Sequence, residues 1–243
     1  RHFGRAAEAY AEAASAAFGG RVEIVHNQSY DPAAASDMLG LLTPVAAAQP
    51  DMLFQMGLVP AQQAQLVETM NQLGFTGVFA GEQWILPYIL QRNSGQSIAG
   101  RLYGAFTVEA AEPTFSPRAH DFYQRYLKKF GEKEWTTDAS ATYCALGTVE
   151  VGLAAAPSID AAAVMDALYK METVNHPVFG ASKWGGQDIF GANHHLLTPL
   201  PIYNTDASGA FTVDGVVDPA AWWAANGAAA LPKLEAGGQV FKG

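Results

Sequence analysis

Residues 51–57 are Asp-Met-Leu-Phe-Gln-Met-Gly, and residues 77–81 are Gly-Val-Phe-Ala-Gly. Each is a short apolar run ending in glycine, which is typical of a strand buried on both faces of a parallel sheet. Between them Pro60 suits the first turn of a helix, apolar residues recur at helical spacing, and Gly74 favours a helix end. The stretch therefore predicts a β-α-β unit, and such crossovers are almost always right-handed.

The two predicted strand ends are the first place to look for a binding site. In open α/β sheets ligands bind beyond the carboxyl ends of the strands. Gly57 and Leu58 follow the first strand, while Glu82, Gln83 and Trp84 follow the second. The Glu82 carboxylate could cap the next helix or accept hydrogen bonds from a ligand ammonium group, and both interpretations stay open.

Three apolar side chains could line such a site, namely Phe3, Leu58 and Trp84. Side chains of this type belong more often to a core than to a ligand pocket. Their assignment as walls of the site therefore depends on further support.

Composition excludes several classes of protein. The 243 residues carry a formal charge of −9 and a pI near 5.0, so no basic stripe exists to bind nucleic acid. The single cysteine excludes an internal disulfide and a cysteine zinc cluster. No apolar run approaches the roughly 18 residues needed to span a membrane. These features indicate a packed globular protein.

Catalytic and metal-binding patterns are weak. The adjacent pair His194-His195 would point to opposite faces of a strand, so the two side chains cannot easily share a metal. Cys144 lies on the predicted inner face of a helix, which favours an inert thiol. There is no nucleophile elbow, P-loop or dinucleotide fingerprint. We therefore expect no enzyme, catalytic residue, metal or cofactor, and an enzyme using His195 is the weakest hypothesis.

Outside the β-α-β unit, alternation predicts a strand over 21–27. Three helices are predicted in the middle of the chain, the first capped by Ser116 and the third by Asp160. Two inner faces are predicted for these helices. In the first helix the face comprises Phe122, Tyr126 and Phe130, and in the second it comprises Tyr143, Leu146, Val149 and Leu153.

A series of short patterns runs along the chain, namely His2-Phe3-Gly4, Tyr30, Ser36-Asp37-Met38, Gln49-Pro50-Asp51, Met56-Gly57, Arg101-Leu-Tyr-Gly-Ala105, Phe122-Tyr-Gln-Arg-Tyr126, Ala141-Thr-Tyr143 and Phe179-Gly180. Each pattern is weak alone, but their order is more specific and covers most of the chain. This order resembles the type I periplasmic solute-binding proteins of ABC transporters, especially the branched-chain amino-acid (Leu/Ile/Val) group.

The resemblance implies a Rossmann-like three-layer α/β/α lobe plus an incomplete second lobe. Residues 1–103 would form the ligand-binding lobe, 104–178 a helical part of the family's first lobe, and 179–243 the returning crossover strands and tail. The amino-terminal part of the first lobe would be missing, together with its hydroxyl contacts to a ligand carboxylate. The hinge candidates are 107–109, 176–179 and 197–203.

The resemblance also implies roles for single residues. Phe3 would be the aromatic residue at the entry to the lobe, and a second aromatic position falls near Leu58. Glu82 would be the acidic contact to a ligand ammonium group. The predicted ligand site therefore comprises Phe3, Gly57 and Leu58 together with the run Glu82, Gln83 and Trp84.

The implied function is capture of a small ligand between two hinged lobes, as the extracytoplasmic solute-binding component of an ABC importer. The ligand would be an amino acid, an amide or an aromatic or aliphatic acid. The partners would be ABC permease subunits and the missing amino-terminal segment. The expected location is the periplasm, with a signal peptide that is not in this chain. The alternative is a sensory or regulatory small-molecule-binding module on the same fold, such as an amide or aromatic-acid receptor.

Overall fold

The computed structural model describes residues 2–30, 37–81, 98, 100–104, 116–131, 134–135, 137–206 and 211–241. The chain divides into two compact units, each built from separate stretches of sequence. The first unit comprises Arg1–Phe106, Ile202–Gly215 and Ala224–Gln239, and the second comprises Thr107–Pro201, Val216–Trp223 and Val240–Gly243.

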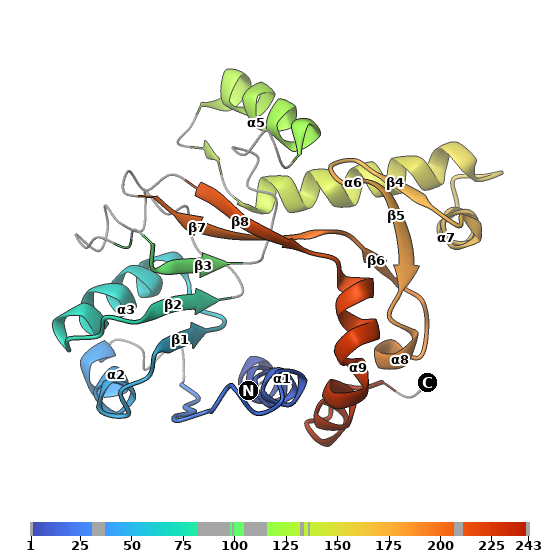
Figure 1. The fold of residues 1–243 in the computed structure, drawn as a ribbon. Helices are drawn as coiled ribbons and strands as arrows, with labels where there is room; N and C mark the ends of the chain where they lie inside the picture. Colours follow the sequence, from blue (N-terminus) through green and yellow to red (C-terminus); the bar gives the residue numbers. More distant parts are fainter. Residues whose placement is uncertain are drawn as a thin grey trace. The chain divides into compact units, whose positions relative to one another are not determined.

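The first unit contains a five-stranded sheet with the strand order β1-β2-β3-β7-β8 (Figure 1). Strands β1, β2 and β3 are parallel, and β7 runs antiparallel to β3. The elements of this unit, some extending past its boundaries, are α1 (His2–Ala17), α2 (Met38–Ala47), β1 (Met52–Gln55), α3 (Pro60–Gln72), β2 (Val78–Gly81), β3 (Leu102–Gly104), β7 (Leu200–Thr205), β8 (Phe211–Val217) and α9 (Pro219–Ala236).

The second unit contains a three-stranded antiparallel sheet with the order β4-β5-β6 and four helices. Its elements are α5 (Pro117–Phe130), α6 (Thr137–Ala155), α7 (Ala161–Lys170), β4 (Val174–His176), β5 (Gly180–Gly185), α8 (Gln187–Phe190) and β6 (His195–Leu197).

The predicted β-α-β unit is confirmed. Helix α3 begins at Pro60, and the chain reverses at Gly74, where φ is +83°. The core lies between one face of the sheet and the helices α2 and α3. Its fully buried side chains include Val67 and Met70 from α3, Phe79 from β2 and Leu102 from β3.

The prediction that β1 is buried on both faces is wrong. Leu53 and Gln55 face the core, but Met52 is 50% exposed and Phe54 is 52% exposed. Helices α2 and α3 cover only one face, and no described residue covers these two side chains on the other. Within the described residues β1 pairs only with β2, so its outer edge is open.

The predicted strand over 21–27 is also wrong, because the structure has no helix or strand between residues 21 and 30. A strand forms only when its backbone finds a ladder partner, and none of the described residues supplies one. Ile24 and Val25 are 41% and 50% exposed as a result.

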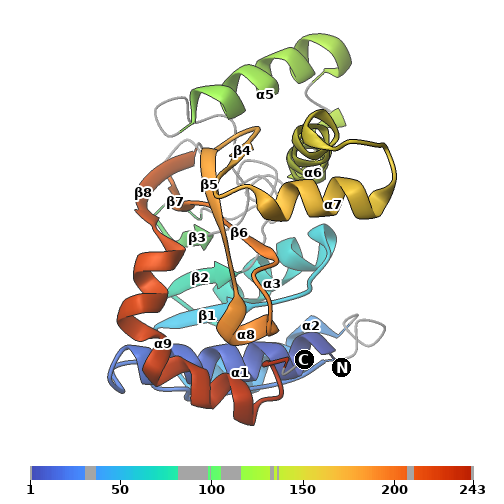
Figure 2. The same ribbon diagram turned by 90° about the vertical axis from the view of Figure 1, so that its right-hand side faces the viewer.

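Helices α1 and α9 pack closely within the first unit (Figure 2). A Cβ atom added at Gly237 would lie 2.4 Å from the Cβ of Ala9, so the backbones approach where both residues are small. The Lys233 ammonium and the Glu12 carboxylate lie 3.8 Å apart across this contact. Their side chains are half-exposed, so the small residues, rather than the ion pair, determine the packing.

The caps predicted for α5 and α7 are confirmed. Ser116 Oγ accepts a hydrogen bond from the Ala119 N–H at 3.2 Å, and Asp160 Oδ1 accepts one from the Ala163 N–H at 2.9 Å. Helix α6 begins at Thr137, so Thr137 and Asp138 lie inside it, whereas the sequence predicts one of them as its cap.

Part of the predicted inner face of α6 is wrong. Leu146, Val149 and Leu153 are 65%, 45% and 42% exposed. The opposite side of the helix packs through glycines, with Gly147 against Pro177 and Gly152 against Leu168. The helix is apolar around most of its circumference, so its periodicity could not identify the side that packs.

The predicted inner face of α5 is only partly correct. Phe122 stacks on Tyr143 with ring centroids 4.0 Å apart, and it belongs to a cluster with Tyr126 and Trp135. Phe130 at the end of the helix is 52% exposed. None of the helices in the described part of the chain is both long and apolar enough to cross a membrane.

Candidate functional site

The carboxyl ends of the three parallel strands lie side by side. Gln55 at the end of β1 pairs with Gly81 at the end of β2, and Gly81 pairs with Gly104 at the end of β3. Residues that follow β1 and β2 therefore emerge at one edge of the sheet, called here the carboxyl edge. This is where open α/β sheets bind ligands.

The turn after β1 is held by two glutamine side chains. The Leu58 N–H donates to Gln55 Oε1 at 3.4 Å, and Gln63 Nε2 donates to the Leu58 carbonyl at 3.3 Å. Gly57 has a φ of +79°, which favours glycine, and it is exposed at the surface of the turn. The two glutamines thus satisfy the backbone of Leu58 and present Gly57 outward.

The side chain of Leu58 is 9% exposed and belongs to the core cluster with Leu53 and Phe79. Its backbone lies at the carboxyl edge, while its side chain anchors the turn to the core. The role predicted for Leu58 as an apolar wall therefore remains a prediction.

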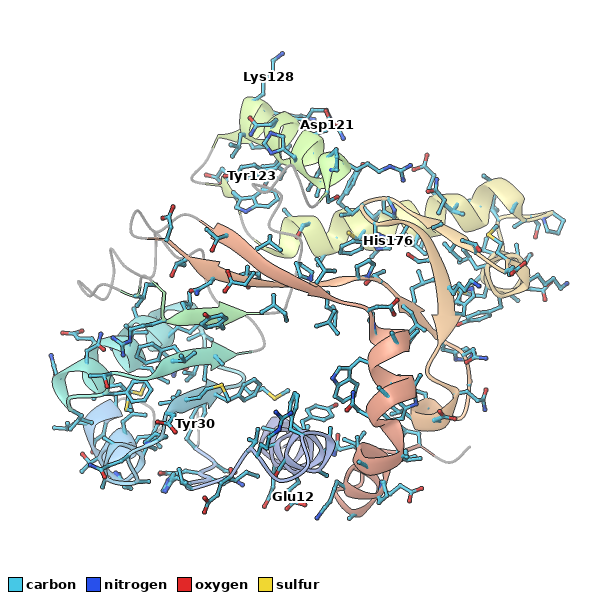
Figure 3. The ribbon with its side chains drawn as sticks, in the orientation of Figure 1. Glu12, Tyr30, Asp121, Tyr123, Lys128 and His176 are labelled. Atoms are coloured by element: carbon cyan, nitrogen blue, oxygen red, sulfur yellow. The ribbon has the colours of Figure 1, made fainter. Side chains whose placement is uncertain are left out.

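Tyr30 adds a side chain that the site prediction did not include. Its hydroxyl donates to the Met56 carbonyl at 3.3 Å, which places a phenol beside the turn after β1 (Figure 3). The side chain is partly buried, and this burial raises the pKa of its hydroxyl. The only sequence signal for Tyr30 is its position in the family resemblance, since no local pattern links residues 30 and 56.

The end of β3 is closed by an aromatic ring. A Cβ atom at Gly104 would lie 2.6 Å from the ring of Tyr203 on β7, and Tyr203 is 2% exposed. Glycine at this position therefore allows the ring to cover the third strand end. Sequence alone could not identify this contact, because residues 104 and 203 are distant in the chain.

The remaining predicted site residues cannot be placed in the same detail. Glu82, Gln83 and Trp84 follow β2 directly and lie outside the described residues. Phe3 lies in the first turn of α1, and its side chain is likewise outside the description. The structure thus brings Gly57, Leu58 and the end of β2 together, and the other assignments remain predictions.

Other candidate chemistry finds no support in the described residues. His194 stacks on Tyr169 with ring centroids 4.6 Å apart, whereas His195 lies near Phe190 at 6.2 Å. The described residues contain no group of three or more side chains that could hold a metal ion. Burial raises the pKa of the Cys144 thiol to about 11, which opposes a nucleophilic role.

A groove of about 420 Å³ lies in the first unit, and none of its lining residues belongs to the strands of the sheet. It is lined by parts of α1 and α9 and by residues 20–24, and it includes Glu12, Glu23 and Lys233. Glu12 and Lys233 are half-exposed, so solvent weakens any charge they offer a ligand.

The first unit is thus an α/β unit whose three parallel strands end at one carboxyl edge. The sequence matches the model of the periplasmic binding protein family over residues 1–210. The chain therefore belongs to the periplasmic binding protein family. This confirms the family inferred from the local patterns, and it agrees with the expectation of a binding protein rather than an enzyme.

Solved structures of low sequence identity share the fold. A branched-chain amino acid ABC transporter periplasmic ligand-binding protein from Burkholderia xenovorans LB400 has a TM-score of 0.57 and 13% identity, and the match covers 77% of this chain and 49% of that protein. An ABC transporter substrate-binding protein from Aeropyrum pernix has a TM-score of 0.58 and 11% identity, with coverage of 79% and 50%.

A third solved structure is the branched-chain amino acid transporter substrate-binding protein LivJ from Streptococcus pneumoniae in complex with isoleucine. Its TM-score is 0.55 at 18% identity, and the match covers 76% of this chain and 49% of LivJ. The chain thus spans about half the length of the solved proteins it matches. A search of curated proteins finds no match.

Proposed function

We propose that this chain is part of the solute-binding component of an ABC importer, and that its carboxyl edge contacts an amino acid or a similar small ligand. The observation that carries the proposal is the family match over residues 1–210. The three aligned strand ends support the location of the site. Capture between two hinged lobes, with 1–103 as the ligand-binding lobe, belongs to the same proposal.

In the proposed site Glu82 accepts hydrogen bonds from the ligand ammonium group. Glu82 comes directly after Gly81, the last residue of β2, in the sequence. Gly57 lets a ligand approach the backbone of the neighbouring turn, because it has no side chain there. Phe3, Gln83 and Trp84 complete the proposed ligand contacts.

The proposed partners are ABC permease subunits and an amino-terminal segment of the same protein. We also propose a periplasmic location, which is supported by the family.

Calorimetric titration of the intact protein with amino acids tests the role of Glu82. Glu82→Gln keeps the shape of the side chain and removes its charge, so we expect affinity to fall at least about tenfold through loss of a charge-assisted hydrogen bond. Glu68→Gln is the matched control, since Glu68 is an exposed residue of α3. Unchanged affinity in Glu82→Gln would remove Glu82 from the site.

Titration with amides and with aromatic or aliphatic acids separates the ligand classes. A ligand lacking an ammonium group should bind Glu82→Gln and the unaltered protein equally well. Tight binding of such a ligand, without any binding of amino acids, would contradict the amino-acid proposal. It would leave the family and the fold unaffected.

A further inference from the structure

The turn between β4 and β5 is built around a histidine side chain. The ladder pairs His176 with Gly180, and three residues, 177–179, connect the two strands. The Nδ1 atom of His176 accepts hydrogen bonds from the N–H groups of Val178 at 3.2 Å and Phe179 at 3.1 Å. An Nδ1 atom that accepts two donors carries no proton, so the neutral imidazole has its proton on Nε2.

This imidazole is enclosed. His176 is 7% exposed, Val178 is 4% exposed, and the ring centroid of Phe179 lies 5.0 Å from that of the imidazole. A buried backbone N–H that loses its acceptor costs about 1–3 kcal/mol. The two hydrogen bonds to Nδ1 are therefore important for the turn.

The charged group that faces this turn from α5 is a cation. Arg118 Nη1 donates to the Asn175 side chain at 3.0 Å and to the His176 carbonyl at 3.4 Å. Gly180 of β5 pairs with His176, and Gly147 of α6 packs against the adjacent Pro177. Burial lowers the pKa of His176, in agreement with a site that favours the neutral ring.

The same turn is tied to the beginning of α5. Ser116 Oγ donates to the Val178 carbonyl at 3.0 Å and also caps α5 by accepting from the Ala119 N–H. Ser116 is 4% exposed, so water does not readily replace this link. Ser116 and Arg118 therefore both connect this turn to the beginning of α5.

We propose that the β4–β5 turn is an acid-sensitive latch, released when a proton on His176 Nδ1 displaces the Val178 and Phe179 N–H groups and frees the start of α5. Protonation turns the acceptor into a donor, so three N–H groups would then face one another. The latched state binds fewer protons than the released state. The free energy that favours the latched state therefore has its full value above the ordinary histidine pKa of about 6.5. The stability falls as the pH drops below that value.

Amide hydrogen exchange of the full chain, followed by NMR between pH 5.0 and 7.5, tests the latch. After correction for intrinsic exchange, the protection of Val178 and Phe179 should fall by up to about tenfold per pH unit below pH 6.5, the limit for one linked proton. In His176→Asn the Oδ1 atom takes the place of Nδ1 and does not titrate, so this pH dependence should disappear. His26→Asn, at an exposed histidine, should keep it.

Ser116→Ala tests the link to α5. The pH dependence of protection at the start of α5 should become weaker in this variant, since only the Arg118 contacts then remain, while that of Val178 should be unchanged. A pH dependence that survives in His176→Asn would overturn the proposal. If that variant does not fold, titration of the labelled His176 ring in the unaltered protein decides the question, because a folded-state pKa at or above 6.5 would equally overturn the proposal.

Discussion

Arg101 ties the turn before β2 to the start of β3. Its Nε atom donates to the Gly77 carbonyl at 2.9 Å, its Nη2 atom to the Phe75 carbonyl at 2.9 Å and its Nη1 atom to Asn71 Oδ1 at 3.0 Å. The guanidinium carbon also lies 5.1 Å from the ring centroid of Phe79. Burial lowers the pKa of Arg101, but an arginine remains charged under all ordinary conditions. One planar cation thus satisfies three acceptors at once.

Arg101→Lys preserves the positive charge and removes the planar guanidinium group, which is called here the fork because its nitrogens donate to separate acceptors. A lysine ammonium group can reach only one of the three acceptors in this geometry, so two hydrogen bonds are lost. Hydrogen bonds from a charged donor contribute about 1.5–3 kcal/mol each, and partial exposure reduces this toward about 1 kcal/mol. We therefore expect Arg101→Lys to lower the free energy of unfolding by about 2 kcal/mol.

Urea unfolding followed by circular dichroism measures the total change, and amide exchange over residues 75–81 assigns it to the first unit. Arg125→Lys is the matched control, because Arg125 pairs with Asp121 at 2.8 Å in an exposed i,i+4 ion pair. Such pairs contribute about 0–1 kcal/mol. The role given to the fork would be refuted if Arg101→Lys lowered the free energy of unfolding by less than about 0.5 kcal/mol, or by no more than Arg125→Lys does.

Two further predictions concern the strand end and the thiol. Gly104→Ala should destabilise the chain by about 1–3 kcal/mol in urea unfolding, because the new Cβ overlaps the buried ring of Tyr203. Gly215→Ala, where nothing lies within 4 Å of the new Cβ, should have little effect, and equal losses would contradict the packing argument. Cys144 should react with iodoacetamide at pH 8 about 100-fold more slowly than a thiol of ordinary pKa 9.0, because its pKa is about 11. The rate should rise about tenfold per pH unit up to pH 10, and reaction as fast as free cysteine at pH 8 would contradict the burial of the thiol.

The β-α-β unit could be predicted from sequence because each of its signals is local. Pro60 begins the helix, Gly74 adopts a positive φ just after the helix ends, and the apolar runs on either side form the strands. The caps at Ser116 and Asp160 were predictable for the same reason, since a cap depends on residues three positions apart.

The predictions that needed a partner in space were less successful. Residues 21–27 have a strand pattern, but a ladder requires a second strand, and none of the described residues pairs with them. Leu146 and Val149 were placed on an inner face, although α6 packs through Gly147 instead. An apolar helix has no preferred side until its neighbours are in place.

Local chemistry was thus enough to predict the class of fold and the position of the carboxyl edge after β1 and β2, while the family was inferred from a resemblance in the order of motifs. Tertiary structure alone could show that Gln55 and Gln63 hold the turn at Leu58, and that Tyr203 covers the end of β3. The physical reason is that propensities, caps and turns act over a few residues. Contacts between distant residues depend on strand register and close packing, which no local pattern encodes.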